Sequence, residues 1–221
     1  MRSATRGPFS RILSFMQPYL SVSLNVSGRP CLVVGGDAAA EERVVRLLEA
    51  RAQVSVVAET MTEALGRWAR EGRLHHLARA FAPADLDGVF LVLVCERDAA
   101  LGDAIFAAAE ARGVLVYAQD RPAASHLAMP ALVRRGHLRL AISTDEASPA
   151  LAGRLRADLE RAFDETFVQY THWLDALRTE LREQEPDPER RATALRAAVE
   201  GFALQARLHY PEAFGRAPPR R

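Results

Sequence analysis

Two glycines close the first strongly apolar run of the sequence, residues 31–36, and an acid and three alanines follow them. In a dinucleotide-binding fingerprint the first glycine makes a tight turn, the second lets the backbone approach the pyrophosphate, and a third small residue lets helix and strand pack closely. Gly35 and Ala40 suit the first and third roles, but Asp37 stands in the second. A carboxylate there opposes a doubly negative pyrophosphate, so a nucleotide site and a plain strand-to-helix turn both remain open.

An acidic residue also follows the second apolar run, residues 54–57. From there Glu59 can accept hydrogen bonds from a ribose, as an acid does in many dinucleotide-binding domains. An exposed loop carboxylate is the equal alternative.

A third acid follows the apolar run at residues 114–117. Asp120 would leave the carboxyl end of a strand, a position suited to general acid–base catalysis. An aspartate before Arg-Pro is also favourable turn chemistry. His126, six residues later, can titrate near neutrality, or it can be a structural or solvated histidine.

Residues 143–149 form a segment rich in hydroxyls and acids. Ser148 can cap a helix that begins at Pro149, and acids are favourable at a helix N-terminus. Arginines flank the segment in sequence, and guanidinium groups pair with carboxylates in a bidentate way, which suits a ligand with several carboxylates. They are Arg134, Arg135, Arg139, Arg154 and Arg156, each of which can also be a surface charge.

These residues need a scaffold that brings strand ends together. Apolar runs at 31–34, 54–57, 74–77, 88–95 and 114–117 alternate with helical patterns, the clearest at residues 99–112. Strand–helix alternation with short connections predicts an α/β fold with a Rossmann-like doubly wound parallel sheet. Ligands of such sheets lie beyond the carboxyl ends of the strands.

The pattern changes after residue 130. Residues 137–143 alternate like a strand, and the spacing predicts helix from Arg154 to about His209, interrupted only at 185–188. This region is too apolar for a solvated appendage, so we expect a small helical domain or a dimer interface.

Composition narrows the function classes. All 29 basic residues are arginine, so lysine chemistry such as Schiff-base formation is excluded. A net charge of +1 gives no reason to expect nucleic-acid binding. Cys31 and Cys95 lie in apolar runs and are interpreted as core residues, not as a disulfide or metal pair. No apolar run could span a membrane, and residues 12–16 are too short for a signal sequence, so a cytoplasmic location is expected.

Taken together, the segments resemble the precorrin-2 dehydrogenase family, which includes stand-alone dehydrogenases, a bifunctional dehydrogenase/ferrochelatase and the N-terminal module of siroheme synthase. The resemblance covers about Tyr19 to Glu212. It rests on residues 24–36 (LNVSGRPCLVVGG), 85–88 (DLDG), Asp120 with Pro122, 129–136 (MPALVRRG) and 140–152 (LAISTDEASPALA). Residues 163–171 (FDETFVQYT) look most like the stand-alone enzymes.

The resemblance implies a domain plan and a homodimer. After a loose tail at residues 1–18, an NAD-binding domain would span 19–128. A dimerisation region at 129–163 and a C-terminal helical domain at 164–221 would follow.

The resemblance also implies a reaction, the NAD-dependent oxidation of precorrin-2, an octacarboxylate tetrapyrrole, to sirohydrochlorin. Asp120 would be the acid/base. The cofactor would contact Gly35, Gly36, Asp37, Ala38, Glu59, Cys95 and Glu96. The substrate would contact Ser143, Thr144, Ser148, Arg134, Arg135 and His126, and no resident metal is expected.

Departures from the family pattern concentrate at the expected site. They are Asp37 for a third glycine, residues 96–102 (ERDAALG) for T-D-D/N-x-x-V-N, Tyr117 for an asparagine, and Asp145 and Glu146 for loop glycines. Two alternatives therefore stay open. One is a metal chelatase or non-catalytic tetrapyrrole-binding protein with a degenerate NAD site, in which Asp145 and Glu146 would attract a metal ion. The other is a structural or regulatory dimer that binds no nucleotide.

Overall fold

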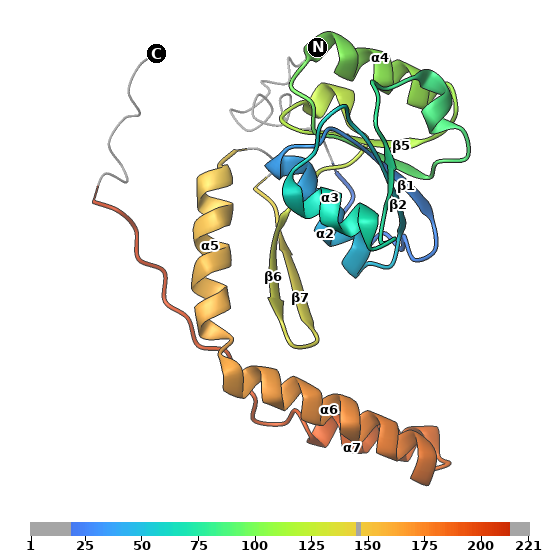
Figure 1. Ribbon diagram of the computed structural model, residues 1–221. Coiled ribbons are helices and arrows are strands. Elements are labelled where there is room, and N and C mark those ends of the chain that lie inside the picture. Colours follow the sequence, from blue (N-terminus) through green and yellow to red (C-terminus); the bar gives the residue numbers. More distant parts are fainter. Residues whose placement is uncertain (1–18, 145–146, 213–221) are drawn as a thin grey trace, which may run out of the picture. The chain divides into compact units, whose positions relative to one another are not determined.

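The computed structural model describes residues 19–144 and 147–212 (Figure 1). The predicted tail at 1–18 and the loop acids Asp145 and Glu146 lie outside the described residues. The chain divides into two compact units, one within Met1–Ala131 and Ile142–Gly153, the other within Leu132–Ala141 and Arg154–Arg221.

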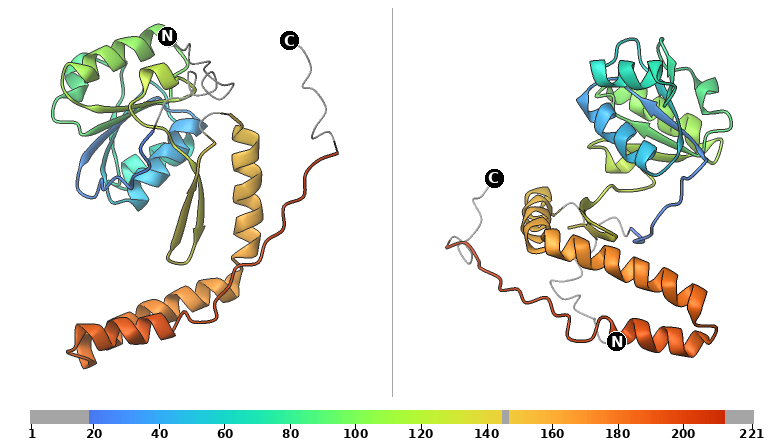
Figure 2. Two further views of the ribbon diagram at one scale, coloured as in Figure 1. Left: turned by 180° about the vertical axis from the view of Figure 1, so that it is seen from behind. Right: turned by 60° about the horizontal axis from the view of Figure 1, so that its bottom comes forward.

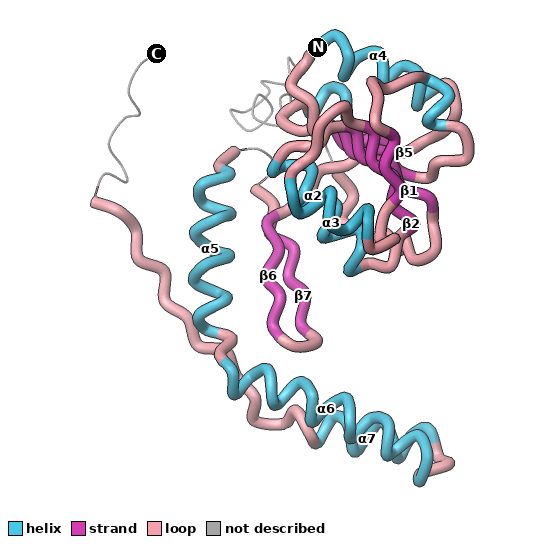
Figure 3. Tube along the Cα trace, in the orientation of Figure 1, coloured by secondary structure: helices cyan, strands magenta, loops and turns pink. Residues whose placement is uncertain are grey.

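A five-stranded parallel sheet forms the centre of the first unit, with the strand order β3-β2-β1-β4-β5 (Figures 1 and 3). The strands are β1 (Pro30–Val34), β2 (Gln53–Val57), β3 (His75–Leu77), β4 (Leu91–Val94) and β5 (Leu115–Ala118). The connections contain the helices α2 (Ala38–Glu49), α3 (Glu63–Arg70) and α4 (Ala99–Glu110) and the 3-10 helices η1 (Pro83–Leu86) and η2 (Pro122–Ala124). The predicted Rossmann-like α/β fold is confirmed.

Helices cover both faces of this sheet, which is why the strands could be apolar at consecutive positions (Figure 2). Cys31 and Val33 belong to the core on the face of α2 and α3. Leu32 and Val34 belong to the core on the opposite face, where Ile105 of α4 packs. The sheet is therefore rigid from both sides, and its carboxyl edge is a fixed platform for loops.

The strand order reverses at β1. The chain steps outward from β1 to β3 and then crosses back to β4, which pairs with the other side of β1. The loops that leave β1 and β4 therefore diverge, and ligands of open α/β sheets bind in the crevice this creates.

The second unit contains most of the hairpin of β6 (Ala131–Arg135) and β7 (Leu138–Ile142), the part of helix α5 (Pro149–Ala162) from Arg154 onward, and the helices α6 (Glu165–Gln184) and α7 (Pro188–Ala197). Strand β6 has no counterpart in the sequence-based expectations. Gly136 turns the hairpin with a φ of 53°, and a Cβ there would lie 2.1 Å from Oγ1 of Thr171 on α6. The hairpin tip thus packs directly on α6.

The prediction of helix to about His209 is wrong. α7 ends at Ala197, and residues 202–211 form no regular secondary structure. Gly201 takes a φ of 80°, and the ring of Phe202 then stacks on Tyr170 of α6, with the centroids 5.6 Å apart. The hydroxyl of Tyr170 donates to the carbonyl oxygen of Ala198 at 2.9 Å. These tertiary contacts redirect a segment whose local spacing is helical.

Candidate functional site

A cleft of about 580 Å³ opens at the carboxyl edge of the parallel sheet. Its walls are the residues that follow β1, β2, β3 and β4, so it lies at the reversal of strand order. Five of the seven residues predicted to contact the cofactor line it: Gly36, Asp37, Glu59, Cys95 and Glu96. Of the other two, Gly35 belongs to the β1–α2 turn and Ala38 is the first residue of α2.

The β1–α2 turn passes very close to the loop after β2. A Cβ on Gly36 would lie 1.9 Å from the carbonyl oxygen of Thr60, and the carbonyl oxygen of Gly36 accepts from Thr62 N–H at 2.9 Å. Gly35 has a φ of 120°, a conformation that side chains rarely allow. The two glycines therefore let the backbone itself form one wall of the cleft.

Asp37 caps helix α2. Its Oδ1 accepts hydrogen bonds from the N–H groups of Ala39 and Ala40, both at 3.0 Å. Such a cap stabilises a helix by about 1 kcal/mol. Where no side chain caps the helix, a phosphate binds these N–H groups at a helix N-terminus. In this chain a carboxylate already occupies them.

In the part of the chain that the structure describes, the cleft is lined by three carboxylates and two guanidinium groups, and of the two guanidinium groups Arg79 is paired with another residue. Its carboxylates belong to Asp37, Glu59 and Glu96, and its guanidinium groups to Arg79 and Arg97. Both arms of Arg79 are taken by Asp85, with Nη1 2.8 Å from Oδ2 and Nη2 2.5 Å from Oδ1. No hydrogen bond or ion pair joins the guanidinium of Arg97 to another residue in the described ranges. Arg97 is therefore the cation of the cleft that is ready for an anionic ligand.

Asp85 also caps η1 by accepting from Ala82 N–H at 2.8 Å, and its side chain is only 5% exposed. Replacing Asp85 with asparagine is expected to lower the free energy of unfolding at pH 7 by about 1–2 kcal/mol, because a charge-assisted pair is lost. The hydrogen bond from Arg79 holds the pKa of the Asp85 carboxyl below its usual range. A pKa lowered in the folded state stabilises the fold above the pKa of the unfolded carboxyl, about 4, and this stabilisation disappears as the pH falls through the folded value.

Thermal unfolding followed by circular dichroism checks this prediction. The difference in Tm between the wild-type chain and Asp85→Asn should stay constant from about pH 7 to pH 5 and narrow below about pH 4. A difference that persists unchanged at the acidic end would show that the carboxylate charge contributes nothing.

Cys95 directly follows β4 and lines the cleft. Burial raises the pKa of its thiol to about 12, so it adds no charge at neutral pH. Cys31 is buried too, and burial raises its pKa to about 11. Both cysteines are free, as the interpretation of them as core residues requires.

Tyr117, which stands where the family has asparagine, faces helix α2. Nη2 of Arg43 donates to the Tyr117 hydroxyl at 3.2 Å, and the guanidinium carbon lies 5.1 Å from the ring centroid. The pair joins α2 to β5.

Asp120 lies in the loop that follows β5, at the same edge of the sheet. Its side chain is exposed and its φ is 56°, in the left-handed region that few residues other than glycine adopt. Gln119 N–H donates to the carbonyl oxygen of Val94 at the end of β4. The exposed carboxylate of Asp120 therefore follows β5, which pairs with β4, and the residues after β4 line the cleft.

His126 has both ring nitrogens engaged. Its Nδ1 accepts from Val116 N–H at 3.1 Å, so Nε2 carries the proton and donates to Oε1 of Glu110 at 2.6 Å. Its ring also packs on Phe106 of α4, with the centroids 5.0 Å apart. These contacts tie the end of the Asp120 loop to β5 and α4, and a contact with substrate stays a prediction.

The predicted substrate residues fall into two places. Ser148 Oγ accepts from Leu151 N–H at 3.2 Å and caps α5, and Thr144 Oγ1 accepts from Ser148 N–H at 3.2 Å. Ser143 precedes them in the first unit. Arg134 and Arg135 belong to the second unit, where Nε of Arg135 donates to the carbonyl oxygen of Glu160 at 2.9 Å.

Sequence reasoning did not single out Arg79 or Arg97. Arg97 directly follows Glu96 in the segment assigned to the cofactor site, so its position was a usable signal. Arg79 follows a strand of three residues with no motif, and only the structure places it in the cleft.

Comparisons with known proteins agree with this fold. Residues 22–131 match a protein-family model described as "Putative NAD(P)-binding". A siroheme synthase of Nitrosococcus oceani is 32% identical over 166 residues, which are 75% of this chain and 36% of that protein. Siroheme synthase 2 of Yersinia pestis is 41% identical over 143 residues, 64% of this chain and 30% of that protein. The chain thus spans about a third of these relatives.

The deciding comparison is with a solved structure, "SirC, precorrin-2 dehydrogenase". It superposes with a TM-score of 0.74 at 30% identity, over 83% of this chain and 90% of that one. The chain belongs to the precorrin-2 dehydrogenase family. Membership accounts for the parallel sheet and for the cleft where its strand order reverses.

The residues of the cleft fit a nicotinamide dinucleotide at most points. Gly36 gives the close backbone approach, Arg97 offers a cation, and Glu59 offers an acceptor for ribose hydroxyls. Asp37 is the one local disagreement. Among the described residues, no group of three or more His, Cys, Asp or Glu side chains could hold a metal ion, and no helix is long and apolar enough to cross a membrane.

Proposed function

We propose that the chain catalyses the dehydrogenation of precorrin-2 to sirohydrochlorin with NAD⁺ as the acceptor. The observation that carries this proposal is that Asp120, an exposed carboxylate, leaves the end of β5 next to the cleft, in a fold that matches a precorrin-2 dehydrogenase over 90% of that chain. The reaction removes two hydrogens from the tetrapyrrole, one as a hydride and one as a proton.

The roles of the residues follow from this balance. A nicotinamide held in the cleft would supply the acceptor for the hydride. The carboxylate of Asp120 accepts the proton from the tetrapyrrole carbon that is being oxidised, and water then takes that proton away. The walls of the cleft, above all Gly36 and Arg97, hold the dinucleotide at the end of the sheet.

Substrate binding is assigned to groups that suit carboxylates. Guanidinium groups pair with carboxylates through two parallel hydrogen bonds, and hydroxyls donate to them. Ser143, Thr144, Ser148, Arg134, Arg135 and His126 are proposed to take part in binding the tetrapyrrole.

The preference for NAD over NADP is assigned to Glu59. A carboxylate accepts from a 2′-hydroxyl but repels a 2′-phosphate, and Arg79 cannot compensate because Asp85 fills its fork. NAD should therefore bind at least about 10-fold more tightly than NADP, since repulsion between two charges a few ångströms apart is worth about 1–4 kcal/mol.

Glu59→Gln tests this preference. The variant should gain about 10-fold in NADP affinity while its NAD affinity changes less, because only the charge is removed. Isothermal calorimetry with both cofactors measures the ratio. Glu63→Gln, an exposed acid at the start of α3, is the matched control and should leave the ratio alone. An unaltered ratio in Glu59→Gln would place the 2′-position elsewhere.

A homodimer in the cytoplasm is also proposed. The second unit exposes large apolar side chains that a partner copy would cover, among them Phe202 at 52% and Leu208 at 72%. Light scattering during size-exclusion chromatography should give twice the monomer mass of 24.3 kDa. A monomeric mass at micromolar concentration would contradict this.

One observation favours a second candidate, a sirohydrochlorin metal chelatase or non-catalytic tetrapyrrole-binding protein. Asp37 occupies the N–H groups that normally bind pyrophosphate, which would leave the NAD site degenerate. A structural dimer that binds no nucleotide is the third reading.

Incubation with precorrin-2 and NAD⁺, followed by the absorbance of sirohydrochlorin and repeated with Fe²⁺ or Co²⁺, separates these readings. Product formed only with NAD⁺ supports the dehydrogenase. Tetrapyrrole binding or metal insertion without NAD binding supports the second candidate, and binding of neither ligand supports the third.

A further inference from the structure

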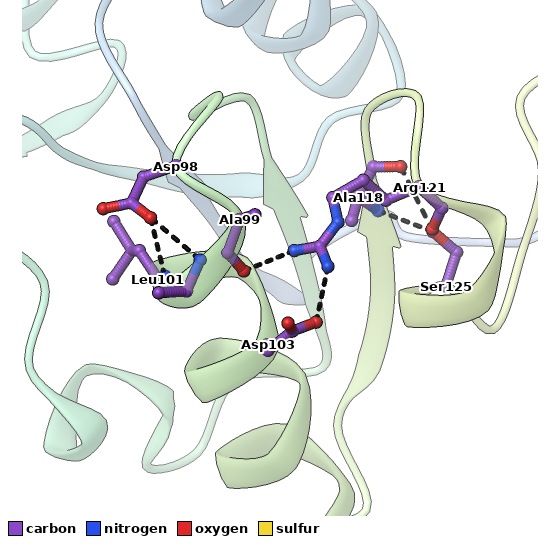
Figure 4. Close-up of polar contacts among 8 residues, drawn as sticks. Asp98, Ala99, Leu101, Asp103, Ala118, Arg121 and Ser125 are labelled. Carbon is purple, nitrogen blue, oxygen red and sulfur yellow. Dashed lines mark hydrogen bonds and ion pairs between the residues drawn. The ribbon is translucent and has the colours of Figure 1, made fainter.

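The loop that carries Asp120 is held by bonds between its own ends, by Gln119 N–H, which donates to the carbonyl oxygen of Val94, and by the contacts of His126. Ser125 Oγ accepts from Ala118 N–H at 2.8 Å and donates to the carbonyl oxygen of Arg121 at 3.0 Å (Figure 4). These bonds close the loop, but they do not by themselves tie its tip to the rest of the sheet edge. Asp120 sits near this tip in a left-handed conformation that costs about 1 kcal/mol for a residue with a side chain. Contacts between the loop and the rest of the first unit oppose the release of that strain.

Arg121 supplies the contact next to Asp120 that reaches the start of α4. Its side chain leaves the loop and reaches the first turn of α4, where Nη1 donates to the carbonyl oxygen of Ala99 at 2.6 Å (Figure 4). Nη2 donates to Oδ1 of Asp103, also at 2.6 Å. The two terminal nitrogens of the guanidinium thus bind α4 at two places, the backbone carbonyl of Ala99 and the carboxylate of Asp103, and these two bonds form the grip of Arg121 on α4.

A glycine makes room for this grip. A Cβ on Gly102 would lie 2.5 Å from Nη1 of Arg121 and 3.6 Å from its Cζ. Glycine in the interior of a helix costs about 0.5–1 kcal/mol relative to alanine. Here the missing side chain is replaced by the guanidinium, which lies against the helix backbone between Ala99 and Asp103.

The grip joins the two parts of the proposed site. Leu101, one residue before Gly102, lines the cofactor cleft, and Asp120 is the residue before Arg121. Nη1 and Nη2 of Arg121 each donate one hydrogen bond to α4, and 29% of the side chain is exposed.

We propose that Arg121 is a positioning residue, which fixes the Asp120 loop to α4 so that the carboxylate is held at the cofactor cleft. This inference rests on the proposed dehydrogenase function for its effect on turnover. The loop ordering that it describes exists independently of that function.

Gly102→Ala is the sharpest test, because it displaces the guanidinium without altering Arg121 or Asp120. The clash is with the end of a flexible side chain, and alanine favours the helix, so the variant should fold with an undiminished Tm. Gly66→Ala in α3 is the matched control, since its Cβ would meet nothing nearer than Nη1 of Arg70 at 3.5 Å. Arg121→Gln removes the same grip from the other side.

We expect kcat for precorrin-2 to fall about 10-fold in Gly102→Ala and in Arg121→Gln, because small misplacements of reacting groups are costly. The Kd for NAD should stay within about twofold. Hydrogen–deuterium exchange of residues 119–125 should accelerate about 10-fold in both variants and not in Gly66→Ala.

The outcomes separate the two proposals. Wild-type turnover with unchanged kcat in both variants overturns the positioning role alone. If the Kd for NAD rises by as much as kcat falls, Arg121 shapes the cofactor site, and the positioning role is overturned too. If the wild-type chain does not turn over precorrin-2, the proposed function is overturned. Hydrogen–deuterium exchange of residues 119–125 still tests the fixation of the loop in that case, and unchanged exchange in both variants overturns it.

Discussion

Asp120→Asn is expected to lower the turnover of precorrin-2 by about 10²–10⁴-fold, the usual contribution of a general acid–base residue. The amide cannot accept the proton that leaves the substrate, while its size and shape match those of the carboxyl. Affinity for NAD, measured by calorimetry, should be unchanged because Asp120 lies outside the cleft walls. The loss should therefore appear in kcat.

The backbone makes asparagine the right substitution. Asp120 has a φ of 56°, and asparagine adopts this left-handed region more readily than other residues with a side chain. Alanine would add about 1 kcal/mol of strain and confuse a structural effect with a chemical one. Asp120→Gly relieves the strain, so it should be at least as stable as the wild type. Its turnover of precorrin-2 should be as low as that of Asp120→Asn.

Asp87→Asn provides the matched control. Asp87 is an exposed aspartate that pairs with Arg112, Nε to Oδ1 at 3.0 Å, and the cleft does not include it. The same chemical change there should leave turnover intact. If Asp120→Asn turns over precorrin-2 as fast as Asp87→Asn does, Asp120 has no part in the proton transfer.

The parallel sheet was predictable because its signals are local. Residues 31–34 and 54–57 are apolar without interruption, as strands covered on both faces are, and the glycines after the first run mark its turn. Caps could be predicted for the same reason. Ser148 accepts from Leu151 N–H at 3.2 Å, as its place before Pro149 suggests.

The end of the helical region was not predictable from local spacing. Residues 198–209 continue the apolar pattern, yet Phe202 leaves the helix to stack on Tyr170, more than 30 residues earlier in the chain. A partner at that separation has no signature in a window of a few residues. Strand β6 escaped prediction similarly, since residues 131–135 combine three apolar residues with two arginines and show no alternation.

At the candidate site, most of the positions that line the cleft could be predicted, but the contacts of the side chains could not. Asp120 followed from its place after a strand, whereas the grip of Arg121 on α4 depends on Asp103 and on the space above Gly102. For His126 the sequence left a titrating, a structural and a solvated histidine open, and its bonds to Val116 and Glu110 come from two different elements. Only the folded chain brings such groups together.

The second large effect is expected at Asp37, where Asp37→Gly should tighten NAD binding by about 10- to 100-fold. In the wild-type chain the pyrophosphate must displace Oδ1 from Ala39 N–H and Ala40 N–H, which costs about 1 kcal/mol of capping. It must also approach a carboxylate, and repulsion at about 4 Å is worth about 1–4 kcal/mol. Removing the side chain removes both penalties.

Asp37→Asn separates the two penalties. Asparagine caps a helix about as well as aspartate but carries no charge. If charge is the main obstacle, Asp37→Asn should recover most of the affinity gained by Asp37→Gly. If occupancy of the N–H groups dominates, only the glycine variant should bind more tightly.

Asp98→Asn is the control for both variants, because Asp98 caps α4 through the same two-donor geometry but is not part of the cleft lining. Its NAD affinity should equal that of the wild type. Calorimetric titration of the four proteins with NAD and with NADH gives the comparison directly. Equal affinity in Asp37→Gly and the wild type would mean that the pyrophosphate binds away from the N-terminus of α2. Arg97, the unpaired guanidinium of the cleft, would then be the group to replace next.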